Sequence, residues 1–286
     1  VDSDTGVVGA DEHALTGQAP RHGVLIAIEA DAKSGGDRIG VEVISVERAI
    51  RQGFEARPLD VLEDQGGDFP RDLMLAMIAE VIAPHPGIFV ASDEIYEYIS
   101  FEQKHESIAQ FDNVRERVII VNGVSKGYAM TGWRIGYIAA PKWIAPACDK
   151  MQGQFTSGTS SISQKAAEAA ICSDNRPTLE MQEAFRRRRD LVIRLMKEIP
   201  GFKVNEPQGA FYVFPDISYY FGNEYGDKVI RTATDFCMFL LHEAHVSLVT
   251  GEAFGDGQCI RFSYAASEEK LSEALKRIRE ACARLQ

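Results

Sequence analysis

VNGVSKGYAMTGWRIGY, residues 121–137, places a single lysine among small and apolar residues. Lys126 follows a continuous apolar run, RVIIVNG (117–123), which is typical of a buried strand in a parallel sheet. A lysine is rarely buried without a partner, and desolvation lowers the pKa of an amine and makes it a nucleophile toward carbonyl groups. The ordinary alternative is a lysine whose stem lies along the core while its ammonium group stays in water.

The segments around this stretch alternate between strand and helix patterns. Apolar runs predict further strands over 87–92 and 134–141, and apolar periodicity predicts helices over 71–84, 141–154, 160–172 and about 177–198. Beyond residue 200, strands are expected over 202–207, 209–217, 246–251 and 259–265, and helices over 233–245 and 267–285. Residues 1–70 lack a long periodicity, and only 40–54 is expected to form a strand followed by a helix. The alternation predicts an α/β architecture with a domain boundary near 173–178.

Composition limits the classes of partner. The chain of 286 residues carries a net charge of −11, which argues against nucleic acid or an anionic membrane as the main partner. No apolar run is long enough to span a membrane, and no signal peptide is expected, so we expect a cytoplasmic protein. The chain begins at Val1, which suggests a processed or incomplete sequence. The five cysteines form no CxxC pair and the six histidines show no zinc-site spacing, so we expect reduced thiols and no metal.

Two polar residues follow the predicted strand 87–92. Asp93 stands at its carboxyl end, where ligands bind in open α/β sheets, and a carboxylate buried there needs a cation as partner. Its ordinary alternative is a helix N-cap. Tyr96 lies three residues further, so in a helical segment it would face the same site; otherwise it is a packing residue.

Arginines stand in two other apolar segments. Arg134, in GWRIGY, offers the planar fork of donors that suits a phosphate. Arg261, in CIRFSYA, lies mid-strand; its ordinary alternative is an exposed strand face shared with Ser263. The run RRRR (186–189) spreads round a helix, and we interpret it as a solvated face.

Five motifs then occur in a specific order: SDEIYE, NGVSKGYAMTGWRIGY, PQGAFYVFP, GEAFG and IRFSYA. Together they resemble fold-type I pyridoxal-phosphate (PLP) aminotransferases of class I, most closely the bacterial aspartate aminotransferase-like group. The resemblance covers residues 71–286. It implies a partial PLP-binding large domain with a mostly parallel sheet (71–175) and an α+β C-terminal small domain (176–286), preceded by an atypical N-terminal segment (1–70).

The resemblance also implies a role for each candidate residue. Lys126 would form the internal aldimine with PLP and then move the proton between the substrate Cα and the cofactor. Asp93 would bind the pyridine nitrogen, and Tyr96 the 3-oxygen of the ring. In the family, Arg134, helped by Ser125, would bind the phosphate, and Arg261 the substrate α-carboxylate. TSGTSS (156–161) resembles a segment at the dimer interface, so a homodimer is expected.

The resemblance fails in residues 1–70. Family members carry there a phosphate-binding loop of small residues, an aromatic residue that stacks on the ring, and an NPTG-type stretch. EDQGGDFP (63–70) stands where that stretch should end and does not match it.

The sequence leaves several functions open. The first hypothesis is an aminotransferase that moves the amino group of an amino acid, L-aspartate first among them, to a 2-oxo acid such as 2-oxoglutarate, in a ping-pong reaction. The alternatives are a truncated inactive relative, another PLP reaction such as a C–S lyase or a decarboxylase, and a PLP-sensing transcription regulator. The acidic composition argues against the last, which needs a basic DNA-binding module.

Overall fold

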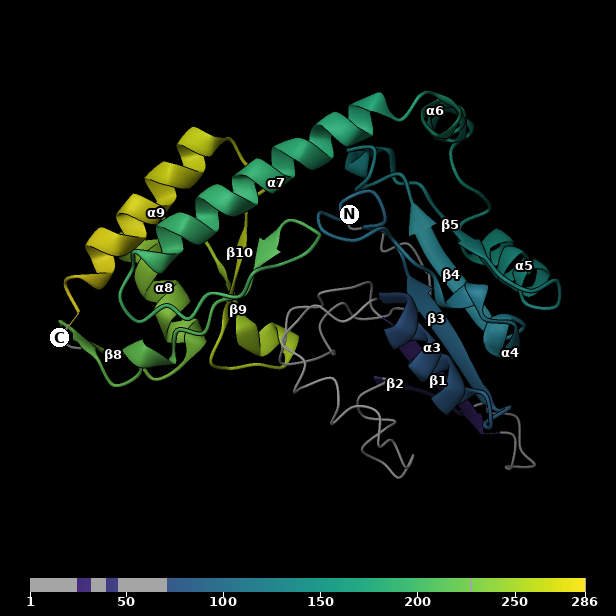
Figure 1. The fold of residues 1–286 in the computed structure, drawn as a ribbon, viewed down its shortest axis with the longest axis horizontal. Coiled ribbons are helices and arrows are strands. Elements are labelled where there is room, and N and C mark those ends of the chain that lie inside the picture. Colours follow the sequence, from purple (N-terminus) through teal and green to yellow (C-terminus); the bar gives the residue numbers. More distant parts are fainter. Residues whose placement is uncertain (1–24, 32–39, 46–70, 227, 286) are drawn as a thin grey trace. The chain divides into compact units, whose positions relative to one another are not determined.

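The computed structural model describes residues 25–31, 40–45, 71–226 and 228–285 (Figure 1). These residues divide into two compact units. Unit 1 contains the described residues between 25 and 98 together with 103–175, and unit 2 contains 99–102 and the described residues from 176 onward. The chain therefore passes from unit 1 to unit 2 and back before it enters unit 2 finally at residue 176.

Unit 1 is built on a five-stranded sheet with the order β2-β1-β3-β4-β5. Its strands are β1 (Leu25–Asp31), β2 (Gly40–Ser45), β3 (Ile88–Asp93), β4 (Val118–Gly123) and β5 (Gly136–Ala139). Among the described strands only β3 and β4 are parallel, whereas β1 pairs antiparallel with β2 and β3, and β4 with β5. The expectation of a mostly parallel sheet is therefore wrong for these strands, although the α/β class is confirmed.

The connections explain which pair is parallel. Parallel neighbours need a crossover of a dozen or more residues, usually with a helix. The segment between β3 and β4 provides one, with the short helices η1 (Ile108–Gln110) and α4 (Asp112–Arg115). The segment 124–135 between β4 and β5 folds back as turns, so β5 runs antiparallel to β4.

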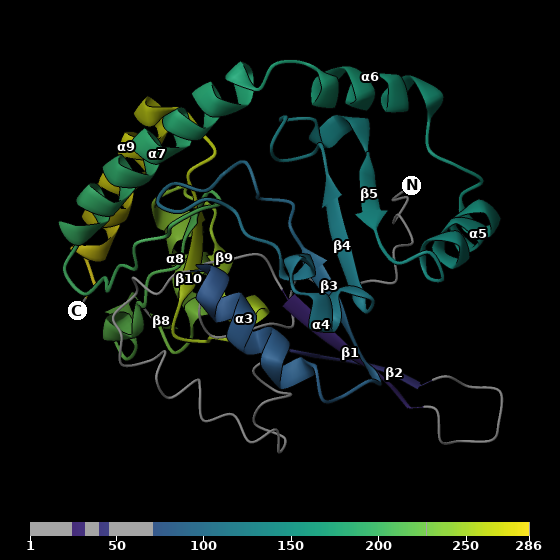
Figure 2. The same ribbon diagram turned by 45° about the vertical axis from the view of Figure 1, so that its right-hand side comes forward.

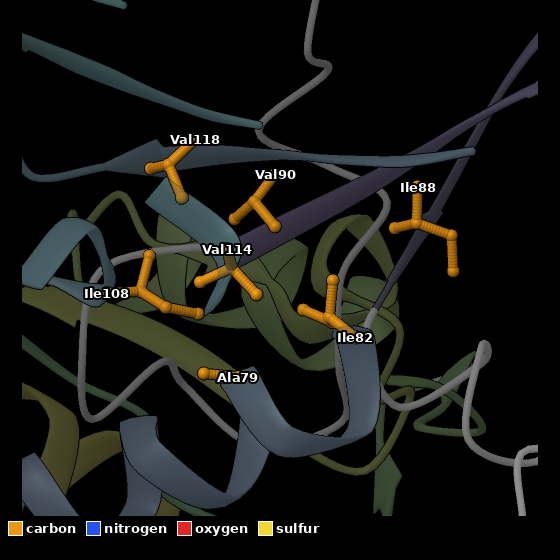
Figure 3. Packing of buried hydrophobic residues seen from close by; sticks show 7 residues of the cluster. All are labelled: Ala79, Ile82, Ile88, Val90, Ile108, Val114 and Val118. Carbon is orange, nitrogen blue, oxygen red and sulfur yellow. The ribbon is translucent and has the colours of Figure 1, made fainter. Parts of the chain in front are cut away.

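The core of unit 1 lies between helix α3 (Arg71–Ile82), strands β3 and β4, and the crossover (Figure 3). Ala79 and Ile82 of α3 face Val90 of β3, and Val114 and Val118 close the cluster. Ile88 and Ile108 belong to the same buried group. Each large aliphatic side chain buried there contributes about 1.5–3 kcal/mol through the hydrophobic effect, which holds β3 and β4 in place.

The end of α3 is fixed by one side chain. The Arg117 guanidinium donates to the carbonyl oxygens of Ile82, Ala83 and His85 at 3.4, 3.2 and 2.5 Å. Carbonyls in the last turn of a helix have no partner within the helix, and a cation there also interacts favourably with the helix dipole.

Unit 1 also contains the helices α5 (Ala145–Phe155) and α6 (Ser161–Cys172). Neither contributes much to a core: α5 has no buried residue, and Ala167 is the buried residue of α6. Phe155 and Ile162 are 73% and 75% exposed.

Unit 2 is an α+β unit. Its helices are α7 (Arg176–Lys197), α8 (Ala233–Glu243) and α9 (Glu268–Cys282), and α7 and α9 lie side by side in both views (Figures 1 and 2). The three-stranded sheet β6-β10-β9 consists of Tyr212–Val213, Ile260–Ser263 and Val249–Thr250, and β7 (Glu224–Tyr225) pairs with β8 (Lys228–Val229). Thr232 and Asp235 form a capping box at the start of α8, and the Ser267 side chain caps α9.

The segment 99–102 is bound to unit 2 by side chains of α7. Gln182 Nε2 donates to the Ser100 carbonyl at 2.6 Å, and Arg186 to that of Phe101. Arg189 is 5% exposed and pairs with Glu102 at 2.8 Å. The interpretation of 186–189 as a solvated face is therefore wrong for Arg189, because this side chain is buried and one of its partners, Glu102, lies 87 residues away in the sequence.

The other predicted elements are mostly confirmed. The predicted helices appear as α3 and α5 to α9, and the strand in 40–54 appears as β2, while the helix expected after it lies outside the described residues. The strand expected over 202–207 is reduced to a bridge between Lys203 and Asp216. None of the helices in the described ranges is both long and apolar enough to cross a membrane.

Candidate active site

Asp93 lies at the carboxyl end of β3, opposite Val121 in the parallel neighbour β4. Its Oδ1 accepts a hydrogen bond from the Ile95 backbone N–H at 3.1 Å. This contact closes the turn 94–98, so the side chain caps a turn and no helix follows it. The half-buried Asp93 therefore sits at the edge where ligands bind in open α/β sheets.

Lys126 lies in the turn that follows the end of β4. Its side chain is half-buried, and Nζ lies 5.8 Å from the centroid of the Tyr96 ring. A cation within about 6 Å of an aromatic ring is attracted to its face. Asp93, Tyr96 and Lys126 therefore lie at the same edge of the sheet, just beyond the carboxyl ends of β3 and β4.

Two glycines let these segments approach closely. A Cβ atom on Gly127 would lie 2.7 Å from Cδ2 of Tyr98, and one on Gly123 would lie 2.8 Å from the Ile135 carbonyl oxygen. Both distances are too short for a side chain. Gly127 therefore allows the turn of Lys126 to pack against the turn of Tyr96, and Gly123 allows the end of β4 to lie close to the start of β5.

The connection 124–135 also carries Ser125 and Arg134. Ser125 is half-buried and precedes Lys126 in the same turn. Arg134 is exposed, and its Nη1 donates to the Thr131 carbonyl at 3.0 Å. Ala129 and Arg134 have φ angles of 53° and 52°, the left-handed region, which costs about 1–2 kcal/mol for a residue with a Cβ. Such strain concentrates at ligand-binding segments.

Glu94 is a buried residue of this region that the sequence analysis did not single out. Its carboxylate is the acceptor for Ser92, His105 and Ser107 at 3.0, 3.0 and 2.6 Å. Burial acts to raise the pKa of Glu94, but the hydrogen bonds from His105 and Ser107 outweigh it and lower this pKa. The only sequence signal was its place inside SDEIYE.

Glu97, further along the same turn, is a second carboxylate that binds a distant part of unit 1. Glu97 accepts a hydrogen bond from Asn122 Nδ2 at 3.1 Å, and the rings of Tyr98 and Tyr128 meet edge to face at 5.3 Å. A carboxylate oxygen of Glu94, one of Glu97 and a ring nitrogen of His105, which are atoms that can bind a metal ion, lie within 4.8 Å of one another. Because serine and amide donors already bind both carboxylates, we interpret this trio as a hydrogen-bond network.

Arg261 lies in unit 2, on strand β10. Its guanidinium carbon is 4.5 Å from the centroid of the Tyr212 ring and 4.3 Å from that of Phe254. Within the part of the chain that the structure describes, the guanidinium forms no hydrogen bond or ion pair. Two rings therefore hold a half-buried cation whose N–H donors are available for a planar anion.

The family model "Aminotransferase class I and II" matches residues 65–278. The chain belongs to this family. The resemblance to class I aminotransferases is thereby confirmed.

Similar proteins include a "Bifunctional aspartate aminotransferase and glutamate/aspartate-prephenate aminotransferase" of Petunia hybrida. It is 49% identical over 221 residues, which are 76% of this chain and 46% of the relative. An "Aspartate aminotransferase" of Rhizobium meliloti strain 1021 is 44% identical over 73% of this chain and 52% of its own length.

Solved structures similar to this aminotransferase-family chain also include aspartate aminotransferases. A crystal structure of the Rhizobium meliloti aspartate aminotransferase is similar with a TM-score of 0.71 and 42% identity, over 74% of this chain and 54% of that one. A Thermus thermophilus aspartate aminotransferase with maleate gives a TM-score of 0.65 at 35% identity, over 74% of this chain and 52% of that one. These neighbours confirm fold type I. The chain spans about half the length of the relatives it matches.

Proposed function

We propose that this chain is a PLP-dependent aminotransferase that transfers the amino group of L-aspartate to 2-oxoglutarate in a ping-pong reaction. The observation that carries the proposal is the meeting of Lys126, Tyr96 and Asp93 at the carboxyl edge of β3 and β4. The names of the relatives, among which aspartate aminotransferase recurs, support the choice of aspartate.

The chemistry of these side chains fits PLP. Lys126 offers an amine for its aldehyde, and Tyr96, whose ring lies 5.8 Å from Nζ, offers a phenol for the neighbouring ring oxygen. Asp93 offers a carboxylate that keeps a ring nitrogen protonated. Arg134 and Ser125 offer donors for the phosphate from the connection that also carries Lys126. When bound, PLP supplies an electron sink for negative charge at the substrate Cα.

The residues of the chain then divide the remaining work. The Lys126 amine would take the proton from the substrate Cα and deliver it to the cofactor, and such positioned proton transfer contributes about 10²- to 10⁴-fold in rate. Arg261 binds the α-carboxylate in plane, because its fork of N–H donors matches the two carboxylate oxygens. Asp93 would keep the ring nitrogen of the cofactor protonated, and Tyr96 would donate a hydrogen bond to its ring oxygen.

The proposal includes a domain assignment and a homodimer. Residues 71–175 form the PLP-binding large domain and 176–286 the small domain, with 1–70 as an atypical N-terminal segment. The exposed apolar side chains of α5 and α6, among them Phe155 and Ile162, support a second copy as their cover. The segment 156–161, which runs from the end of α5 to the first residue of α6, is the proposed contact. We place the protein in the cytoplasm on its acidic composition and unpaired cysteines.

One observation favours a second candidate, an inactive PLP-binding relative. The family match begins at residue 65, and the motifs of the family's N-terminal part are not found in residues 1–70. A C–S lyase uses the same kind of lysine, aspartate and arginine, so product analysis must accompany the test.

The deciding experiment is the visible absorption spectrum of the purified protein with added PLP, before and after L-aspartate. Lys126→Ala is compared with Lys165→Ala, which alters an exposed lysine of α6. A band that needs Lys126 and bleaches with aspartate, with oxaloacetate as product, supports the aminotransferase. A Lys126-dependent band that aspartate leaves unchanged favours the inactive relative, and pyruvate or sulfide from other amino acids favours a lyase. No band in the unaltered protein refutes PLP binding.

A further inference from the structure

Two aromatic rings reach the Arg261 guanidinium from the two strands that flank its own. Arg261 stands on β10, the middle strand of the sheet β6-β10-β9, and its guanidinium carbon lies 4.5 Å from the centroid of the Tyr212 ring and 4.3 Å from that of Phe254. Tyr212 belongs to β6, and Phe254 follows β9. The motifs PQGAFYVFP, GEAFG and IRFSYA therefore meet at one guanidinium.

The register of the sheet places Tyr212 beside Arg261. Tyr212 pairs with Ser263 of β10, and Arg261 lies two residues before Ser263, on the same face of the strand. Diagonal neighbours of this kind lie about 7–8 Å apart, within reach of an aromatic ring and a long side chain. Phe262 and Val213 pair on the opposite face and are 3% and 0% exposed, which fixes the register, because a shift by one residue would expose them.

A tight turn presents the second ring. Helix η4 (Gly251–Phe254) starts directly after β9, and the Gly251 N–H donates to the Cys259 carbonyl at 2.8 Å, just before β10 begins. A Cβ atom on Gly251 would lie 2.2 Å from that carbonyl oxygen, so glycine is needed for this approach. Gly255 ends η4 with a φ of 84°, in the left-handed region that favours glycine. The glycines of GEAFG therefore shape the turn that carries Phe254.

These rings are the contacts that orient the Arg261 guanidinium. Strand β10 fixes the backbone of Arg261, but the end of so long a side chain is fixed only by the groups around it. Within the described ranges the guanidinium has no hydrogen bond or ion pair, so the two rings hold it there. A carboxylate of the protein would occupy the N–H donors and neutralise the charge, whereas a ring face leaves both for a ligand.

We propose that Tyr212 and Phe254 are positioning residues, whose rings together orient the Arg261 guanidinium so that its paired N–H donors meet the substrate α-carboxylate. This inference rests on the proposed function, because that function gives Arg261 its carboxylate. The carboxylate keeps its charge throughout the reaction, so the rings support the bound substrate and the transition state alike. Loss of a ring should therefore raise KM more than it lowers kcat. The amino acid and the 2-oxo acid carry the same carboxylate, so both should be affected equally.

The test removes each ring separately. Tyr212→Leu and Phe254→Leu keep an apolar side chain without a ring, and Tyr212→Phe keeps the ring without its hydroxyl. Phe214→Leu is the matched control, because Phe214 packs edge to face on Phe254 in the same buried cluster and is not one of the two rings over Arg261.

The first readout needs neither PLP nor substrate. Phenylglyoxal modifies guanidinium groups, and mass spectrometry of the peptide that carries Arg261 gives the rate at this residue. The group must lose a proton to react, and a ring face stabilises its charged form. We therefore expect the reaction to be about 5- to 30-fold faster in Tyr212→Leu and in Phe254→Leu, the factor that corresponds to one cation–π contact. Tyr212→Phe and Phe214→Leu should stay within about 2-fold of the unaltered rate, because both rings remain.

The second readout uses the PLP-loaded protein. We expect each leucine variant at 212 and 254 to raise KM for L-aspartate and for 2-oxoglutarate by the same factor, about 5- to 30-fold, with kcat changed less than about 3-fold. Tyr212→Phe should keep the KM of the unaltered protein, and so should Phe214→Leu. An unchanged KM and modification rate in either Tyr212→Leu or Phe254→Leu would overturn the proposal, as would an equal rise of KM in Phe214→Leu.

The two proposals fail in different ways. If the unaltered protein shows no band with PLP, the aminotransferase proposal fails, while the phenylglyoxal rates still decide whether the rings hold Arg261. If the band and its bleaching are normal but Tyr212→Leu and Phe254→Leu react and turn over like the unaltered protein, the function stands and the positioning role falls.

Discussion

Phe155 and Phe236 show how differently the two units use the same residue. Phe155, at the end of α5 in unit 1, is 73% exposed, whereas Phe236, in α8 of unit 2, is fully buried against Phe202, Tyr220 and Phe239. Unit 2 closes a core with its own helices. Unit 1 positions the charged and aromatic groups of the candidate site, and leaves apolar side chains of α5 and α6 on its surface. The difference is therefore local: α5, in the unit that carries Lys126, leaves a large apolar side chain in solvent, whereas α8 buries its phenylalanine within its own unit.

The largest effect is expected from Phe236→Ala. Removal of a buried phenylalanine destabilises a core by about 3–5 kcal/mol, and here it should affect unit 2. Both tryptophans, Trp133 and Trp143, lie in unit 1, so urea unfolding followed by their fluorescence reports unit 1, while circular dichroism reports both units. We expect the dichroism midpoint to fall further than the fluorescence midpoint. An equal fall in both would show that the units unfold as one.

Arg261→Lys tests whether binding of the substrate α-carboxylate needs the paired N–H donors of a guanidinium or only a positive charge. Lysine keeps the charge but loses the planar pair of donors, so kcat/KM for aspartate should fall about 10- to 100-fold, the equivalent of about 1.5–3 kcal/mol. Arg277→Lys, on the exposed side of α9, serves as the control. If Arg261→Lys keeps full activity, the carboxylate is bound elsewhere.

Acid should weaken both units through one carboxylate in each. In unit 2, partial burial acts to raise the pKa of Asp216, but hydrogen bonds from Lys203 and Ser218 lower it, as the network lowers the pKa of Glu94 in unit 1. A pKa that is lower in the folded state gives stability that is complete above the pKa of the unfolded chain and is lost as the pH falls through the lower value. Urea midpoints should therefore fall between about pH 5 and about pH 3.

The two carboxylates can be separated by substitution. Glu94→Gln should flatten the pH dependence of the fluorescence midpoint, and Asp216→Asn that of the dichroism midpoint. Slopes that match those of the unaltered protein in both variants would assign acid sensitivity to other groups.

The smallest effect on folding is expected from Phe155→Ser. A substitution at an exposed position usually changes the free energy of unfolding by less than about 0.5 kcal/mol. Self-association should nevertheless weaken, because the proposed dimer covers this side chain. Sedimentation velocity over a concentration series measures it, and an unchanged association constant would place the dimer contact elsewhere.

Much of the fold was predictable from local pattern. Helices α7 and α9 follow from their periodicity, and β3 and β4 from continuous apolar runs. The direction of β5 was not predictable, because it depends on how the connection 124–135 folds back. The strand expected over 202–207 shrank to the bridge of Lys203 with Asp216, since the Phe214 N–H donates to the side chain of Asn205 and not to its backbone.

The candidate site was predictable to the extent that its residues stand inside specific motifs. The sequence pointed to Asp93, Tyr96 and Lys126, and the structure brings them to one edge of a sheet. Glu94 and Arg189 were missed for the same physical reason. Among the partners of Glu94 is Ser107, 13 positions away, and among those of Arg189 is Glu102, 87 positions away, so no local pattern reveals these two contacts.

The segment 99–102 has a consequence for how the protein folds. Its partners on α7 follow it by 82 to 87 residues, a separation that includes residues 103–175 of unit 1. Loop closure over such a distance costs entropy before any contact compensates it, and folding slows as contacts become less local. During synthesis, these four residues leave the ribosome long before the helix that binds them. The completion of unit 2 must therefore wait for an early piece of chain to be captured late, which makes this step a candidate for the slow phase of refolding.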